Sequence, residues 1–341
     1  MTDILIHKSG QIGHITLNRP KALNALTYQM CLDIEIALDD WANDDAVKMV
    51  LIDAAGEKAF CAGGDIQEMY DTAKAGDFDY GRRFWADEYR MNAKLANFPK
   101  PFVALMQGFT MGGGVGVSCH GSHRVVCETS QIAMPECSIG LVPDVGGSLL
   151  LARAPGFLGE YLGTTASRMD AGDAIYAGFA DYYIPFSEWP VLTETLIETG
   201  DWEAIDRAGQ PAPASKLKEM QPQIDHHFSA VDMLSFCNML DGSDWCNKVE
   251  KTLRRNSPIS VSCTMELIRR VRGFTRIEDA LNMEYRFTYR SASDGDFAEG
   301  IRAAIIDKDR NPQWKHTSLE AVNLMQISKM LQPLGANALK L

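Results

Sequence analysis

Hydrophobic residues near the start of the chain first alternate with polar ones and then change to a helical spacing. The apolar stretches 4–6 and 12–17 lie on either side of Lys8-Ser9-Gly10, which predicts a β-hairpin. Behind Thr27, apolar side chains recur at intervals of three and four residues, which predicts a helix with Thr27 as its N-cap. The apolar stripe consists of Met30, Ile34, Leu38 and Trp41.

Strands and helices alternate in the next part of the chain. Residues 47–52 and 102–106 are nearly continuous apolar runs, as in strands buried on both faces, and 124–127 and 132–134 read as shorter strands. Helices are predicted over 65–75, over 80–97 and after the glycine cluster at 112–116. Beyond Gly147 the pattern is almost entirely helical.

This order predicts an α/β fold in which the strands come first. We expect a core over residues 1–205, which would hold the active site, and a helical C-terminal region over residues 206–341. The stretch 205–225, which contains several prolines, is the predicted linker.

The overall charge narrows the choice of partners. The 341 residues are 46% hydrophobic and 23% charged, with a formal net charge of −12. This acidity argues against nucleic acids and anionic membranes as partners, and the apolar runs are too short for a bilayer. The first residues resemble neither a signal nor a transit peptide, so a cytoplasmic location is the expectation. The sequence leaves monomer and homo-oligomer open.

Cysteine and histidine show no metal-binding spacing. The eight cysteines form no C-x-x-C pair, and the seven histidines form no H-E-x-x-H motif. We therefore expect free, buried thiols and no metal. The adjacent His226 and His227 are expected to be structural or exposed.

Two glycine loops are candidates for binding a ligand oxygen through backbone N–H groups. Residues 60–65 contain Gly63-Gly64, and residues 111–114 contain Gly112-Gly113-Gly114. Each loop precedes a predicted helix start, where N–H groups lack helical partners and the helix dipole favours negative charge. The alternative is that both loops are merely tight turns.

Glu88 stands out on the helix predicted over residues 80–97. It lies within an apolar stripe formed by positions 80, 84, 88, 91, 95 and 98. This spacing favours an inward-facing carboxylate that lines a pocket. The alternatives are a residue at the edge of the stripe and a residue that pairs with an arginine.

Glu136 and Asp144 lie eight positions apart in an apolar stretch rich in glycine and proline. No lysine or arginine separates them. Ionised carboxylates are costly in such surroundings unless they are hydrogen-bonded, so both are candidates for acid–base or nucleophilic chemistry. Asp144 could instead be the N-cap of the helix that follows, and Glu136 could be a surface residue.

Several of these stretches carry a family resemblance. The more general ones are Ile15-Thr16-Leu17-Asn18-Arg19-Pro20, Asn24-Ala25-Leu26 and the glycine loops at 59–66 and 108–114. More specific ones are 88–89, 112–116, 134–136, 140–147, 256–258, 282–286, 300–303 and 307–314. Together they resemble the crotonase, or enoyl-CoA hydratase/isomerase, superfamily. Within it, the chain is most similar to the 3-hydroxyisobutyryl-CoA hydrolases.

The resemblance implies a crotonase-like spiral of ββα units with a helical C-terminal region, and an acyl-CoA thioester as substrate. It implies an oxyanion hole formed by the N–H groups of Gly64 and Gly113, with Glu136 and Asp144 at the reacting carbons. Glu88 would contact the acyl group. No cofactor is implied, because CoA is part of the substrate.

One departure from the hydratases bears on the reaction. They carry a second glutamate on the helix after the glycine cluster, where this chain has Gly116. The resemblance therefore favours hydrolysis of 3-hydroxyisobutyryl-CoA, or of a close β-hydroxyacyl-CoA, as in valine catabolism. The alternatives are an enoyl-CoA hydratase or isomerase and a non-catalytic member of the fold.

Overall fold

The computed structural model describes residues 2–341, which form two compact units. The first unit comprises the residues up to Asp65, Asp87–Ala133 and Arg168–Lys218, and the second comprises Ile66–Ala86, Met134–Ser167 and Glu219–Leu341. The units thus alternate along the chain, whereas the regions expected from the sequence follow one another.

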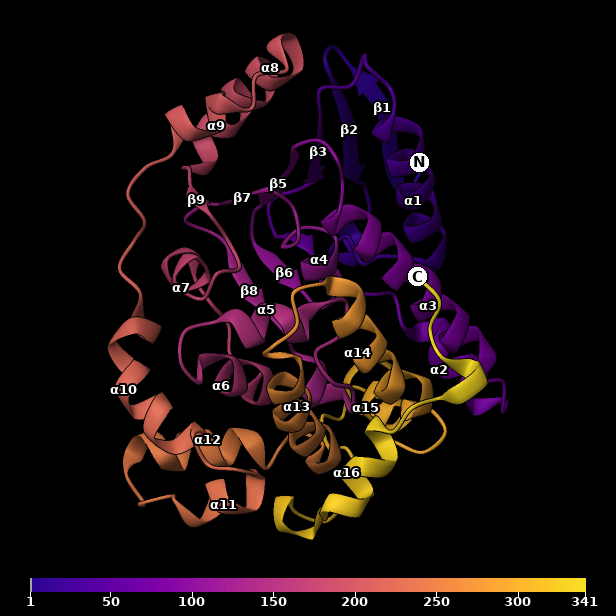
Figure 1. Ribbon diagram of the computed structural model, residues 1–341, viewed down its shortest axis with the longest axis vertical. Coiled ribbons are helices and arrows are strands. Elements are labelled where there is room, and N and C mark those ends of the chain that lie inside the picture. The colour runs from indigo at the N-terminus through magenta and orange to yellow at the C-terminus, as the bar shows by residue number, and fades with distance from the viewer. Residues whose placement is uncertain (1) are drawn as a thin grey trace. The chain divides into compact units, whose positions relative to one another are not determined.

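The first unit contains two β-sheets (Figure 1). The larger has the order β1 (Ile4–Ser9), β2 (Ile12–Leu17), β3 (Met49–Ala54), β5 (Phe102–Met106), β7 (His123–Val126) and β9 (Tyr182–Tyr183). The smaller has the order β4 (Ala59–Cys61), β6 (Phe109–Met111) and β8 (Gln131–Ala133). β1 and β2 form the predicted antiparallel hairpin, and the remaining strand pairs are parallel.

The chain winds repeatedly between the two sheets. A strand of the large sheet is followed by a strand of the small sheet and then by helix, as in β3–β4, β5–β6 and β7–β8. Each return to the large sheet adds a parallel strand, which requires a crossover connection. This repeat confirms the expected spiral of ββα units.

The helices of the first unit cover both faces of the large sheet, and one of them carries the glycine loop. They are α1 (Tyr28–Ala42), the part of α3 (Asp79–Ala96) from Asp87 onward, α4 (Gly113–Gly116), α7 (Ala171–Tyr176), α8 (Trp189–Thr199) and α9 (Glu203–Ala208). Alternate strand residues such as Met49, Leu51 and Val103 are fully buried in one cluster with Leu196 and Ile205 of α8 and α9. The period of two along the strands thus places one face under these helices.

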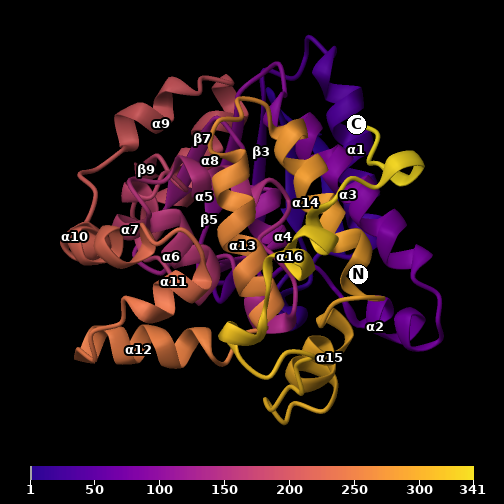
Figure 2. The same ribbon diagram turned by 60° about the horizontal axis from the view of Figure 1, so that its bottom comes forward.

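All regular elements that the described residues form in the second unit are helical. The α-helices are α2 (Gln67–Lys74), α5 (Gly147–Arg153), α6 (Leu158–Thr165), α10 (Lys216–Phe228), α11 (Met233–Asn238), α12 (Asp244–Leu253), α13 (Pro258–Val271), α14 (Ile277–Ser291), α15 (Phe297–Ile301) and α16 (Leu324–Leu331). α13 is largely buried and packs against α5, α6, α14 and α16 (Figure 2). Within residues 2–341, no helix has both the length and the apolar character that a bilayer crossing requires.

The linker predicted over residues 205–225 is only partly irregular. Residues 209–215 lie outside helices, but α10 begins at Lys216 and contains Pro222. The helix forms because Leu217, Ile224 and Phe228 bury their side chains, which outweighs the poor helix propensity of proline.

Candidate active site

Backbone geometry orients the amide of Gly64 in the first unit. Leu26 N–H donates to Gly63 O at 2.9 Å, and Asp65 N–H donates to Leu26 O at 2.7 Å. Because these two bonds flank Gly64 on the side of Leu26, the N–H group of Gly64 itself faces the opposite side.

Gly113 is the first residue of α4, where a helix offers its own N–H groups no acceptor. A Cβ atom at Gly113 would lie 3.3 Å from Gly64 N and 3.1 Å from Glu88 Oε1. The chain reaches this arrangement through left-handed backbone at Gly63, with φ 110°, and at Gly112, with φ 49°. The structure therefore brings the two glycine loops and Glu88 together. The loops contribute backbone N–H donors, and Glu88 contributes a carboxylate beside them.

Glu88 is only 4% exposed on α3, as its place in the apolar stripe predicted. The charge of Glu88 acts on two buried thiols, those of Cys31 and Cys61. Burial raises the pKa of Cys61 to about 12 and that of Cys31 well above its usual value, and the nearby Glu88 carboxylate adds to both effects. The buried Glu88 carboxylate thus lies near two neutral thiols.

Glu136 begins a short 3₁₀ turn, Glu136–Ile139, in the second unit and is 4% exposed. The turn ends at Gly140 with φ 77°, where a Cβ atom would lie only 2.5 Å from the backbone of Asp296. A Cβ atom at Gly300 of α15 would lie 2.1 Å from Ile139 O. These two glycines allow α15 and the residue before it to pack directly on the turn that carries Glu136.

The Asn256-Ser257-Pro258 stretch fixes the same turn from another side. Ser257 N–H donates to Cys137 O at 3.0 Å, and Ser257 Oγ donates to Asp296 Oδ2 at 2.6 Å. Ser257 is also the N-cap of α13, with Pro258 as the first residue of the helix. This explains why the stretch accompanies Glu136 in the family pattern.

Asp144 lies on a tight turn and is also 4% exposed. Gly147 N–H donates to Asp144 O at 2.6 Å, across Val145 with φ 52° and Gly146 with φ 79°. Left-handed backbone at a β-branched residue such as Val145 costs on the order of 1–3 kcal/mol, and such residues cluster at functional sites. The surroundings therefore hold Asp144 in a strained, defined position.

The alternative that Asp144 is an N-cap is wrong, because Gly146 occupies that position and makes no side-chain cap. Glu284 of α14 caps the start of α5 instead. Its carboxylate accepts from Gly146 N at 2.8 Å and from Ser148 N at 3.0 Å, and also from Ser148 Oγ. Glu284 thus supplies the side-chain acceptor for the amides at the start of α5.

Glu284 is fully buried. Burial raises the pKa of Glu284 to about 8, with a contribution from the charge of Asp144, although its three hydrogen bonds favour the ionised form. The stretch around Glu284 is part of the family resemblance, but the sequence pattern indicated no role for Glu284 itself. A capping residue that is 138 positions away in the chain gives no local signal.

A pocket of about 620 Å³ lies in the first unit. It is lined by Pro20, Lys21, Leu23, Asn24, Ala55, Gly56, Glu57, Lys58 and Ala59. Asn24 shapes it by donating to Ala55 O at 3.0 Å and to Ala59 O at 2.9 Å. Two residues further on, Leu26 Cδ1 lies 3.5 Å from the Cβ position of Gly113. A short stretch of chain thus connects the pocket with the paired amides.

Comparisons with known proteins identify the family of this chain. A family model for enoyl-CoA hydratase/isomerase matches residues 12–331. The mitochondrial 3-hydroxyisobutyryl-CoA hydrolase of Gallus gallus is 38% identical over 99% of this chain and 91% of that protein. Its counterpart from Danio rerio is 38% identical over 100% of this chain and 92% of its own.

Solved structures cover the chain equally well. An enoyl-CoA hydratase from Rhodobacter sphaeroides 2.4.1 has a TM-score of 0.96 at 51% identity, with both chains covered completely. A carnitinyl-CoA dehydratase from Mycobacterium thermoresistibile has a TM-score of 0.94 at 39% identity, covering 100% of this chain and 99% of its own. The chain therefore belongs to the enoyl-CoA hydratase/isomerase family.

Proposed function

We propose that this protein hydrolyses 3-hydroxyisobutyryl-CoA, or a close β-hydroxyacyl-CoA, to the free hydroxy acid and CoA. The observation that carries the proposal is the pair of buried carboxylates, Glu136 and Asp144, each on a turn that other residues of the second unit fix. The names of the relatives that are 38% identical over nearly the whole chain support the same reaction.

In this proposal the N–H groups of Gly64 and Gly113 donate hydrogen bonds to the thioester carbonyl oxygen. That oxygen becomes an oxyanion when the carbonyl carbon turns tetrahedral. Preformed donors stabilise such a charge, and losing one typically costs roughly 3–4 kcal/mol of barrier. Both N–H groups are oriented before substrate binds, because Gly113 begins a helix and the bridge to Leu26 directs the Gly64 N–H away from Leu26.

Glu136 supplies the attack in one of two ways. As general base it takes a proton from water while the water oxygen bonds to the carbonyl carbon. As nucleophile it forms an anhydride through its own oxygen, and water then cleaves that anhydride. In both cases the C–S bond breaks and the CoA sulfur leaves as a thiol once protonated. Asp144 orients the water or binds the substrate hydroxyl, and Glu88 shapes the acyl pocket.

The 620 Å³ pocket is our candidate for the nucleotide end of CoA. Its rim carries the exposed cations Lys21 and Lys58, which suit phosphate groups, together with one acid, Glu57. The reaction needs no further cofactor. A cytoplasmic location stays a prediction, whereas the names of the two 3-hydroxyisobutyryl-CoA hydrolases place those proteins in mitochondria.

Hydration of an enoyl-CoA is the second candidate, because the two solved relatives carry the names of a hydratase and a dehydratase. Against it stands Gly116, a buried glycine in α4 where the resemblance places the second glutamate of the hydratases. Splitting water across a double bond needs two acid–base groups, which favours hydrolysis here.

The test is to incubate the protein with 3-hydroxyisobutyryl-CoA and 3-hydroxypropionyl-CoA and to follow free thiol with a thiol reagent. We expect thiol release with at least one of the two, dependent on enzyme concentration. A protein that releases no thiol from either substrate would overturn the proposal and favour a non-catalytic member of the fold.

A further inference from the structure

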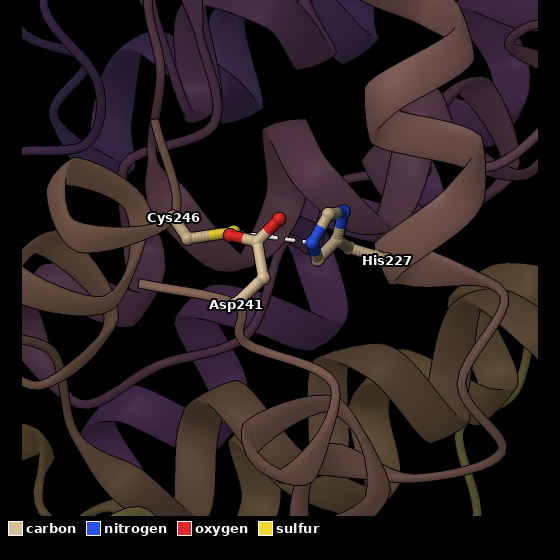
Figure 3. A group of neighbouring side chains, drawn as sticks. All are labelled: His227, Asp241 and Cys246. Carbon is tan, nitrogen blue, oxygen red and sulfur yellow. Dashed lines mark hydrogen bonds between the residues drawn. The ribbon is translucent and has the colours of Figure 1, made fainter. Parts of the chain in front are cut away.

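Three side chains with metal-binding atoms meet in the second unit, and none of them has a part in the chemistry described so far (Figure 3). His227 of α10 and Cys246 of α12 are buried, and Asp241 lies exposed in the loop before α12. One ligand atom from each lies within 4.8 Å of the other two. Cys246 Sγ is 3.1 Å from His227 Nε2.

The hydrogen bonds of His227 fix its tautomer. Nδ1 lies 3.1 Å from Gln223 O. A carbonyl oxygen can only accept, so Nδ1 carries the hydrogen and the Nε2 lone pair faces Cys246 Sγ. Histidines that bind metals have this arrangement, with one ring nitrogen held by a carbonyl and the other directed at the ion.

Cys246 and Asp241 are held in place by the start of α12. Cys246 N–H donates to the N-cap Ser243 Oγ at 3.3 Å, which places the thiol in the first turn of α12. Ser243 N–H donates to Asp241 Oδ1 at 2.9 Å. This bond holds the Asp241 carboxylate beside the first turn of α12.

We propose that His227 Nε2, Cys246 Sγ and an oxygen of Asp241 bind one Zn²⁺ ion, with water as its fourth ligand. Imidazole and thiolate select zinc over magnesium or calcium, which prefer oxygen ligands alone. The thiol proton is released to solvent when the ion binds. The bound ion would tie α10 to α12.

This site departs from the sequence-based expectation of no metal. His227 was expected to lack ligand partners, yet Cys246 contacts it from 19 positions away. The spacing of His227, Asp241 and Cys246 matches no short zinc motif. It becomes a cluster only because α12 folds back on α10, which the sequence pattern does not indicate.

The experiment uses the full-length protein after dialysis against EDTA. Titration with Co²⁺ is expected to give a thiolate-to-cobalt charge-transfer band that saturates at one equivalent and disappears when Zn²⁺ is added. Cys246→Ser should abolish the band, and Asp241→Asn should weaken Zn²⁺ binding about tenfold or more. His226→Gln is the matched control, because His226 is the exposed neighbour on the same helix, and it should bind as the wild type does.

Asp241 is exposed, so Asp241→Asn should fold even if Cys246→Ser does not. Anomalous scattering at the zinc edge from crystals of the wild type would locate the ion independently of any variant. A wild type that binds no Co²⁺ or Zn²⁺ at micromolar concentrations would overturn the proposal and leave a thiol–imidazole hydrogen bond. Equal binding by Asp241→Asn and His226→Gln, or anomalous density elsewhere, would overturn it too.

Discussion

Replacing Gly113 by alanine tests the proposed oxyanion hole with the smallest change that the chain allows. The new methyl carbon would lie 3.1 Å from Glu88 Oε1, 3.3 Å from Gly64 N and 3.5 Å from Leu26 Cδ1. Contacts of 3.1–3.3 Å are a few tenths of an ångström too short, so these neighbours must move slightly. The methyl group would then occupy the space in front of the Gly64 amide, which the substrate oxygen needs.

The free energy of unfolding should change little, by about 1 kcal/mol or less. Gly113 has no left-handed backbone that alanine would strain, and alanine has the better helix propensity. Catalysis should suffer far more. Losing one oxyanion donor costs roughly 3–4 kcal/mol of barrier, which lowers kcat by a factor of about 10²–10³.

The assay is steady-state thiol release from 3-hydroxyisobutyryl-CoA, with thermal unfolding of the same samples. Gly273→Ala is the matched control, because a Cβ atom there meets nothing within 4 Å, and it should leave both kcat and Tm unchanged. A folded Gly113→Ala enzyme that keeps kcat within about threefold of the wild type would show that this amide pair does not stabilise the transition state.

Four further variants test the remaining assignments. Glu136→Gln should lower kcat by about a hundredfold or more with CoA binding retained, because it removes the base or nucleophile, and near-wild-type turnover would exclude Glu136 from the reaction. Asp144→Asn should lower kcat with little change in unfolding free energy, since Gly146 is the N-cap of α5, and unaltered kinetics would return Asp144 to a structural role. Glu284 has a pKa raised to about 8, so the folded protein keeps a proton there that the unfolded chain releases above its ordinary pKa near 4.5. The stability of the wild type relative to Glu284→Gln should therefore fall as pH rises from about 4.5 to about 8, by on the order of 1.4 kcal/mol per pH unit, and a pH-independent difference in chemical denaturation would contradict this. The double variant Lys21→Gln, Lys58→Gln should raise KM for the CoA thioester about tenfold at similar kcat. It should leave KM for the pantetheine thioester, which lacks the nucleotide, unchanged. An equal rise of KM for both substrates would show that the pocket does not bind the nucleotide end of CoA.

Local signals in the sequence predicted most of the fold. The hairpin, the helix behind Thr27 and the buried strands follow from periodicity and capping, and the structure has them within a few residues: Thr27 Oγ1, for example, accepts from Met30 N at 3.2 Å. The glycine loops and the burial of Glu88 could also be predicted from the sequence. A carboxylate that lies within the apolar stripe of a helix must face the same way as the stripe, toward the interior.

Long-range packing explains what the sequence did not predict. Asp144 looked like an N-cap because it precedes a helix, yet the acceptor for those amides, Glu284, comes from 138 positions further along the chain. Pro222 looked like a linker residue, yet it lies inside α10. The meeting of His227 with Cys246 likewise depends on how α10 and α12 pack. In each case the deciding partner is distant in sequence and close in space.

The central claim, hydrolysis rather than hydration, is tested most directly by one comparison on the same enzyme preparation. Free thiol is measured with 3-hydroxyisobutyryl-CoA, and loss of the ultraviolet absorbance of the conjugated double bond is measured with crotonyl-CoA. With Gly116 in place of a second glutamate, we predict rapid thiol release from the first substrate and no loss of absorbance with the second. Rapid loss of crotonyl-CoA absorbance without thiol release from 3-hydroxyisobutyryl-CoA would contradict the account and establish a hydratase.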